Sequence, residues 1–305
     1  MTYMMKPFAY VLIIVLGFGL KRTGFLSDGD RKALTKLMLN VTLPCAIIQA
    51  FDGLALSGRM LLICAIGLAC SGLPLILMYL TTSGVEKRIR AYRMLNIGGY
   101  NLGCFSVPLL SAFFGSAGVV TACLFDVGNA IIMTGGAYAM TSTLLKTGGD
   151  EREGAGEIIM KFLRSTPFDT YMLMLLISAL GIALPQAAFE LTQPIAQANG
   201  FLAMLIIGMA VELASEPAML KETARELMIR YGLAAAFALG IYAFAPFDLL
   251  TRQVLVVICF SPISSLAPVY TERCHSDTAL AGFTNSVSIA VSLVIMLGLS
   301  MVFVG

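Results

Sequence analysis

The chain is a succession of long apolar runs separated by short polar connections. Each run is continuous rather than alternating, which is typical of membrane helices and not of transmembrane β-strands. A helix that crosses the bilayer needs about 20 apolar residues. Ten runs approach this length, at about residues 7–21, 33–51, 60–82, 94–114, 117–145, 167–186, 194–213, 228–246, 252–270 and 278–303. The pattern therefore predicts an all-α polytopic membrane protein with ten transmembrane helices.

Composition excludes a water-soluble enzyme. Of the 305 residues, 58% are hydrophobic and 12% are charged, whereas a soluble domain carries roughly 25% charged residues. The formal net charge is +2 and the basic residues are scattered over short connections, so we expect no nucleic-acid partner. The seven cysteines have no paired short spacing. We interpret them as free thiols and expect neither a metal nor a cofactor.

Basic residues fall mainly on one side of the predicted membrane. All but three of the 20 Lys and Arg residues lie in the odd-numbered connections, the exceptions being Lys6, Arg59 and Arg252. Cytoplasmic connections carry the excess of Lys and Arg in membrane proteins. The odd-numbered connections are therefore predicted to be cytoplasmic. Both termini would then lie outside the cytoplasm, in a multi-pass protein of the inner (plasma) membrane.

The longest connection, Thr147–Thr166, divides the ten runs into two sets of five. An odd number of spans gives the two halves opposite orientations, and such inverted repeats are common in secondary transporters. We expect a first repeat at 1–146, a cytoplasmic linker at 147–166 and a second repeat at 167–305. Spans 5 and 10 support this division, because each carries a polar cluster near its middle.

Two spans carry residues that disfavour an unbroken helix. Span 4 contains three glycines, including Gly103, together with Pro108, and span 9 contains Pro262 and Pro268. Either span alone could be a packed helix with a proline kink. Their corresponding places in the two halves favour a pair of broken helices, which in transporters point to the binding site. The N-termini of half-helices would favour an anion there.

These motifs resemble those of the auxin efflux carrier family, within the bile acid, arsenite and riboflavin transporter group. The resemblance rests on Leu39-Asn40-Val41-Thr42-Leu43-Pro44 in span 2, on Asn101, Gly103 and Pro108 in span 4, and on Pro262, Ala267, Tyr270, Asp277 and Leu280 around span 9. It implies broken helices that cross at Pro108 and Pro262. It also implies a transport domain that moves against a scaffold of spans 1, 2, 6 and 7, with small carboxylates as the substrate class.

Polar residues within the spans are the candidate ligands. Asp126 is the one acidic residue deep within a predicted span, and Asn129 shares its helix face. Asp126 is either a proton or cation site or a protonated carboxyl bonded to Asn129 or to span 10. No Lys, Arg or His lies at predicted mid-depth, so an anion would rely on helix ends and on uncharged side chains. These are Asn101, Ser106, Ser261, Ser264 and Ser265.

Further polar residues have both a binding and a structural interpretation. Asn285 and Ser288 share one face of span 10, where they either bind substrate or form interhelical hydrogen bonds. Asn40 precedes Pro44 in span 2 and can satisfy the backbone that this proline frees.

The sequence thus predicts a secondary active transporter of a small organic anion, working by an elevator-type alternating-access mechanism. The gradient of a proton, of sodium or of the substrate would drive it, and a homodimer is a further expectation. A membrane-embedded enzyme would need paired acids or a metal site, and a non-transporting sensor would need an output domain. Neither is recognisable in the sequence.

Overall fold

The computed structural model describes residues 2–52, 58–147, 166–210 and 217–304, and their regular structure is helical apart from one isolated β-bridge. The first part of the chain contains α1 (Thr2–Arg22), α2 (Asp28–Leu37), α3 (Leu43–Ala50), α4 (Arg59–Thr81), α5 (Lys87–Ile97), α6 (Val107–Ile131) and α7 (Ala137–Leu145). The second part contains α9 (Thr166–Ala179), α10 (Gln186–Ala210), α11 (Pro217–Phe244), α12 (Leu249–Cys259), α13 (Ala267–Arg273) and α14 (Thr278–Val304). Nearly all of the linker predicted at 147–166 lies outside the described residues.

Helix ends follow local sequence signals. Ser27 and Asp30 form a reciprocal capping box at the start of α2. Asp248 caps α12 by accepting hydrogen bonds from the backbone and hydroxyl of Thr251, and these bonds lower the pKa of the Asp248 carboxyl. A π-helical turn, Met38–Thr42, joins α2 to α3 just before Pro44, so that α2 and α3 form one continuous helical rod.

Six helical stretches in the described part of the chain are long and apolar enough to cross a membrane. They are Asp28–Ala50, Met60–Thr81, Leu102–Leu145, Gln186–Ala210, Met219–Phe244 and Thr278–Val304. The chain is therefore a multi-pass helical membrane protein, while the ten-span plan stays a prediction. Fewer stretches than the ten predicted spans are found partly because four helices are each too short to cross a membrane alone. These are α5, α9, α12 and α13. In addition, the stretch Leu102–Leu145 has non-helical backbone at Gly115 and Gly135.

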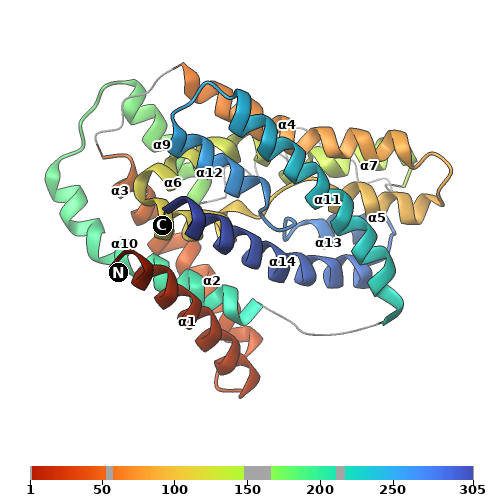
Figure 1. Cartoon of the computed structure of the whole chain (residues 1–305), viewed down its shortest axis with the longest axis horizontal. Coiled ribbons are helices and arrows are strands. Elements are labelled where there is room, and N and C mark those ends of the chain that lie inside the picture. Colours follow the sequence, from red (N-terminus) through yellow and green to blue (C-terminus); the bar gives the residue numbers. More distant parts are fainter. Residues whose placement is uncertain (1, 53–57, 148–165, 211–216, 305) are drawn as a thin grey trace.

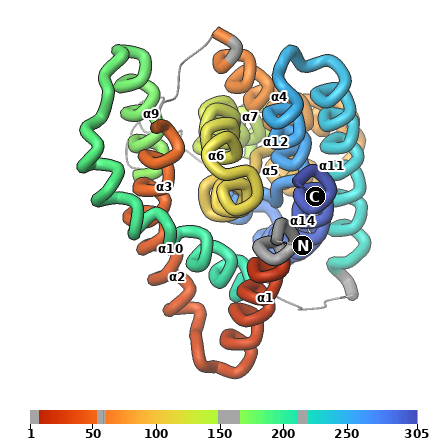
Figure 2. Tube along the Cα trace, turned by 60° about the vertical axis from the view of Figure 1, so that its left-hand side comes forward, coloured from red at the N-terminus to blue at the C-terminus, as the bar shows by residue number. Residues whose placement is uncertain are grey.

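The helices form two packed groups. The first comprises α1, α2, α3, α9 and α10, and the second comprises α4 to α7 and α11 to α14 (Figure 1). Figure 2 shows α2, α3, α9 and α10 on the left and α4, α11, α12 and α14 on the right, with α6 between them. We call these the N-side group and the crossing group. The N-side group consists of the helices of predicted spans 1, 2, 6 and 7.

Reciprocal glycine contacts hold one helix pair in each group at close range. A Cβ atom on Gly17 of α1 would lie 2.2 Å from the carbonyl oxygen of Leu205, and one on Gly208 of α10 would lie 2.0 Å from that of Ile14. In the crossing group, Gly67 of α4 meets the backbone of α6 in the same way, and Gly128 of α6 meets the backbone of α4. Such close backbone approach is typical of membrane helix interfaces.

Candidate functional site

Two helices are interrupted, and their interruptions meet. α5 ends at Ile97 and α12 ends at Cys259, and each is followed by non-helical backbone. Tyr100 and Ile263 form an antiparallel β-bridge, in which the Asn101 N–H donates to the Pro262 carbonyl oxygen (3.0 Å). Backbone N–H and C=O groups inside a membrane protein need hydrogen-bond partners. Each non-helical segment supplies some of these partners to the other. Both breaks were predicted from the sequence, and we call their meeting point the crossing.

On span 4, the crossing lies closer to the N-terminus than predicted. The break occupies Gly98–Asn101, where Gly99 has a φ of +73°, and the chain is helical again from Leu102. Gly103 lies in a π-helical turn, and Pro108 is buried in the first turn of α6. The π-helical turn runs directly into α6, so both residues lie within continuous helical backbone. The assignment of Gly103 and Pro108 to the crossing is therefore wrong, whereas Pro262 is part of it.

Asn129 holds the first break. Its side-chain oxygen accepts from the Tyr100 N–H (2.9 Å), and its amide nitrogen donates to the Tyr100 carbonyl oxygen (3.1 Å). The amide therefore pairs with Tyr100 as a neighbouring strand would. The same amide nitrogen donates to Asp126 (2.8 Å), and the oxygen accepts from the Ser71 hydroxyl (2.9 Å). Asp126 is thus linked to the crossing through one side chain.

Serines and Asn285 hold the second break. The Ser288 hydroxyl accepts from the Ile263 N–H (3.2 Å), and the Asn285 amide donates to the Ser264 carbonyl oxygen (3.3 Å). The Ser106 hydroxyl lies 2.7 Å from that of Ser261 and joins the two broken helices directly. All four serines are buried, and their contacts support the backbone of the crossing. They are Ser106, Ser261, Ser264 and Ser288.

A buried arginine from α11 binds both breaks. Arg230 is 4% exposed, and its guanidinium lies 4.9 Å from the centre of the Tyr100 ring. It donates to the carbonyl oxygens of Ile97 (2.6 Å), Gly99 (2.9 Å), Ser261 (3.1 Å) and Pro262 (3.4 Å). These carbonyls lie at the C-terminal ends of two half-helices, where a positive charge is favoured.

Two sequence expectations about charge are therefore wrong. Arg230 places a cation at the crossing, and Glu226 (1% exposed) is a deeply buried acid, in addition to the half-buried Asp126. The prediction placed Glu226 before the span and Arg230 at its cytoplasmic edge, near residue 228, whereas α11 begins at Pro217 and carries both residues in its interior. Glu226 and Arg230 lie four residues apart on one helix face, which is a signal that the sequence did contain.

A cavity of about 280 Å³ lies beside the crossing. We call it the crossing cavity. Its walls are Arg31 and Thr35 of α2, Ile206, Ile207 and Ala210 of α10, Asn101 in the first break with Cys104 and Phe105 just after it, Ser265 in the second break, and Gly282, Asn285, Ser286 and Ile289 of α14. It therefore lies between the N-side group and the crossing group.

The crossing cavity separates the predicted ligands into two sets. Asn101, Ser265 and Asn285 line it, and the side-chain oxygen of Asn285 is buried without a hydrogen-bond partner in the described structure. Asn40 is exposed, and its side chain contacts the carbonyl of Lys36 and the hydroxyl of Thr166. Neither Asn40 nor Pro44 lines the cavity.

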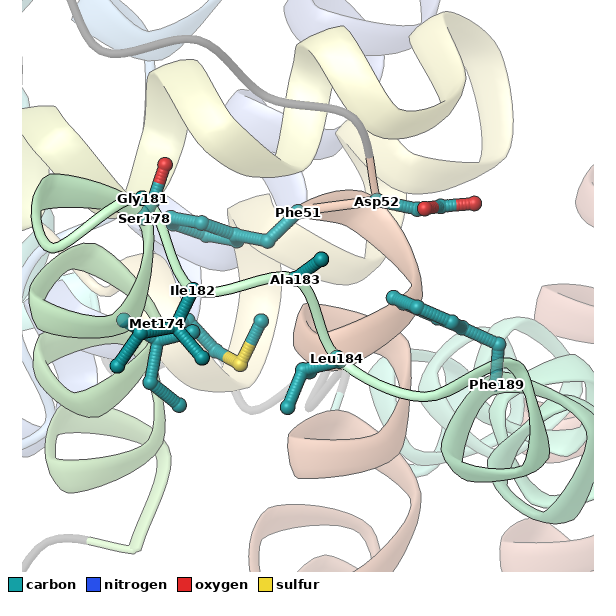
Figure 3. Close-up of a pocket in the computed structure, with 10 residues that line it drawn as sticks. Phe51, Asp52, Met174, Ser178, Gly181, Ile182, Ala183, Leu184 and Phe189 are labelled. Carbon is teal, nitrogen blue, oxygen red and sulfur yellow. The ribbon is translucent and has the colours of Figure 1, made fainter.

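A second cavity, of about 330 Å³, lies at the opposite end of the α2–α3 rod. Figure 3 shows its apolar wall, with Phe51 at the end of α3, Ile182 and Leu184 after α9, and Phe189 on α10. The Asp52 side chain points away from the Phe51 ring. This cavity contains none of the predicted ligands. Within the described ranges, no group of His, Cys, Asp and Glu residues could hold a metal ion.

The architecture is that of a multi-pass membrane protein built around two broken helices that meet. Comparison with known proteins adds that the chain is 26% identical to an uncharacterized transporter of Methanothermobacter thermautotrophicus over 129 residues, which are 41% of this chain and 42% of that protein. No family model matches the chain. The fold and this similarity together indicate a membrane transporter, and the resemblance to auxin efflux carriers stays a prediction.

Replacing Arg230 should weaken the crossing. Arg230→Met leaves four carbonyl oxygens without their cation, and each buried unpaired polar group costs about 1–3 kcal/mol. We expect a clear fall in the thermal unfolding midpoint of the purified protein, with partial recovery in Arg230→Lys. Arg225→Gln, an exposed position on the same helix, is the matched control. Equal midpoints for Arg230→Met and the control would contradict the assigned role.

Proposed function

We propose that the protein is a secondary active transporter of a small organic anion of the carboxylate class. The observation that carries the proposal is the position of the crossing cavity. One wall comes from α2 and α10 of the N-side group, and the other from the crossing and α14. A ligand bound there touches both groups, so any relative movement of the two groups would change the access of that ligand to solvent.

The chemistry of the crossing cavity favours an anion. Arg31 brings a guanidinium, while Thr35, Asn101 and Ser265 bring hydrogen-bond donors. Asn101 also immediately precedes the helical backbone that starts at Leu102, and helix N-termini attract negative charge. The volume of about 280 Å³ is at the small end of ligand pockets, which suits a short carboxylate better than a large aromatic molecule.

The proposed mechanism is of the elevator type. The N-side group would serve as the scaffold, and the crossing group would move against it within a ten-span inverted repeat. Arg31 lies near the start of the α2–α3 rod, close to the basic residues Lys21 and Arg22. With the predicted orientation in the inner membrane, the structure corresponds to a state whose binding cavity lies on the cytoplasmic side. The similarity to a transporter supports this function without identifying a substrate.

Binding of carboxylates to purified protein tests the proposed function. We expect at least one short mono- or dicarboxylate to raise the thermal unfolding midpoint of the wild type, because a ligand that binds only the folded state stabilises it. Arg31→Gln should lose this shift, whereas Lys32→Gln, whose side chain is outside the cavity wall, should keep it. Loss of the shift in both variants, or in neither, would contradict the assignment of the site.

Asp126 is the proposed coupling group of this transport. Its carboxylate contacts Asn129, which in turn holds both polar groups of Tyr100 at the crossing. A change in its charge is therefore transmitted to the broken helix through one hydrogen-bonded side chain. A proton is the favoured coupling ion, and sodium is the alternative that the experiment separates.

Asp126→Asn should retain substrate binding and lose most of the pH dependence of transport. The amide keeps the size of the side chain but has no charge to gain or lose. Flux of the bound carboxylate into proteoliposomes, measured against pH and against sodium, gives the readout. If the variant loses the sodium dependence of flux and keeps its pH dependence, Asp126 is part of a sodium site. A variant with the wild-type response to both ions would remove Asp126 from the coupling mechanism.

A further inference from the structure

Glu226 is a buried carboxyl group that the proposed binding site does not use. It lies on α11, one helical turn before Arg230, and is 1% exposed. Both of its carboxylate oxygens are buried and have no hydrogen-bond partner in the described structure. An ionised carboxylate without donors is strongly disfavoured in such a place. A neutral, protonated carboxyl is the form that fits the geometry.

The charged groups around Glu226 come from α5 and α11. Arg93 on α5 is 4% exposed and pairs with Glu222 at 2.7 Å, while Arg230 follows Glu226 on the same helix. Arg225 is exposed, and the Tyr92 hydroxyl is bonded to Thr284. Two other neighbours of α11 add little charge. α14 has no ionisable residue, and the single charged residue of α12 is Arg252, whose guanidinium donates to the Tyr242 carbonyl oxygen.

Several donors of these guanidinium groups are also unused. Nε and Nη1 of Arg93 and Nε of Arg230 are buried without an acceptor in the described structure. They are the natural partners of an ionised Glu226, since charged hydrogen bonds are the strong ones. The cluster therefore has two chemically reasonable states. In one, Glu226 is protonated and unpaired, and in the other it is ionised and paired with a neighbouring guanidinium.

We propose that Glu226 is a proton-binding site whose ionisation draws Arg230 away from the carbonyl oxygens of the crossing. Arg230 has one guanidinium to share between Glu226 and the C-terminal ends of both half-helices. In the protonated state, which fits the geometry of this structure, the terminal nitrogens of Arg230 all bind the crossing. Loss of the proton gives it a competing anionic partner one turn away. The proton thereby favours one arrangement of the broken helices.

A cavity beside the cluster gives solvent access to Arg93. Arg93 forms part of the wall of a cavity of about 260 Å³ between α4 and α11, and Arg225, Thr81 and Thr82 line the same cavity. Glu222, the partner of Arg93, is about one-third exposed. Water that enters this cavity therefore reaches Arg93 of the Arg93–Glu222 pair, and Glu222 lies one helical turn before Glu226 on α11.

Infrared difference spectroscopy tests proton binding without requiring transport. The purified wild-type protein should show a protonated-carboxyl C=O stretch that is lost as pH rises. Glu226→Gln should abolish this band, and Glu226→Asp should move it. The exposed control Glu272→Gln and the Asp126→Asn variant should both keep it. Persistence of the wild-type band in Glu226→Gln, or absence of any titrating band in the wild type, would overturn the proposal.

The pH dependence of flux tests whether ionisation of Glu226 acts on the crossing. This part of the proposal rests on the proposed transport function. Flux in proteoliposomes should depend less on pH in Glu226→Gln than in the wild type and in Glu272→Gln. An unchanged pH profile would overturn the coupling. If no carboxylate binds the wild type, the transport proposal fails by itself, because the infrared band is measured without substrate. Far-ultraviolet circular dichroism of each variant verifies that the helices are retained.

Discussion

Unwound backbone in the middle of a membrane protein needs hydrogen-bond partners, and the described structure is organised around that requirement. The breaks after α5 and α12 pair with each other through Tyr100 and Ile263. Side chains supply most of the remaining partners. Asn129 binds the first break, Ser288 binds the second, and Arg230 binds carbonyl oxygens of both. The broken helices are therefore stable only together, as one polar centre in an apolar body.

This polar centre also explains where a ligand can bind. The groups that hold the crossing are buried, whereas Asn101, Ser265 and Asn285 face the adjacent cavity. The opposite wall, which includes Arg31, belongs to the other helix group. Support of the backbone and recognition of the ligand thus fall mostly on different residues, and Asn285 takes part in both. Asp126 and Glu226 approach the centre from α6 and α11, so protonation of either acid can act on the crossing without direct contact with substrate.

Much of this arrangement was predictable because glycine, proline and mid-span polar residues break the apolar pattern so clearly. Both breaks, and three cavity residues, followed from that pattern. The crossing was misplaced at Pro108 because proline usually interrupts a helix, whereas the helical backbone here starts at Leu102 and continues through Pro108. Arg230 and Glu226 were missed because hydropathy begins span 8 only after its charged first turns. The pairing of α2 with α14 across the cavity depends on tertiary packing, which no local signal contains.

Relative movement of the two helix groups is the central claim. Spin labels at Leu191 on α10 and Leu239 on α11, both exposed, measure the distance between the groups by double electron–electron resonance. A pair at Leu239 and Val294 measures a distance within the crossing group. A carboxylate that binds in the thermal assay should shift the first distribution and leave the second unchanged. An unchanged first distance with ligand bound, or an equal change in both, would contradict movement of the crossing group as a unit.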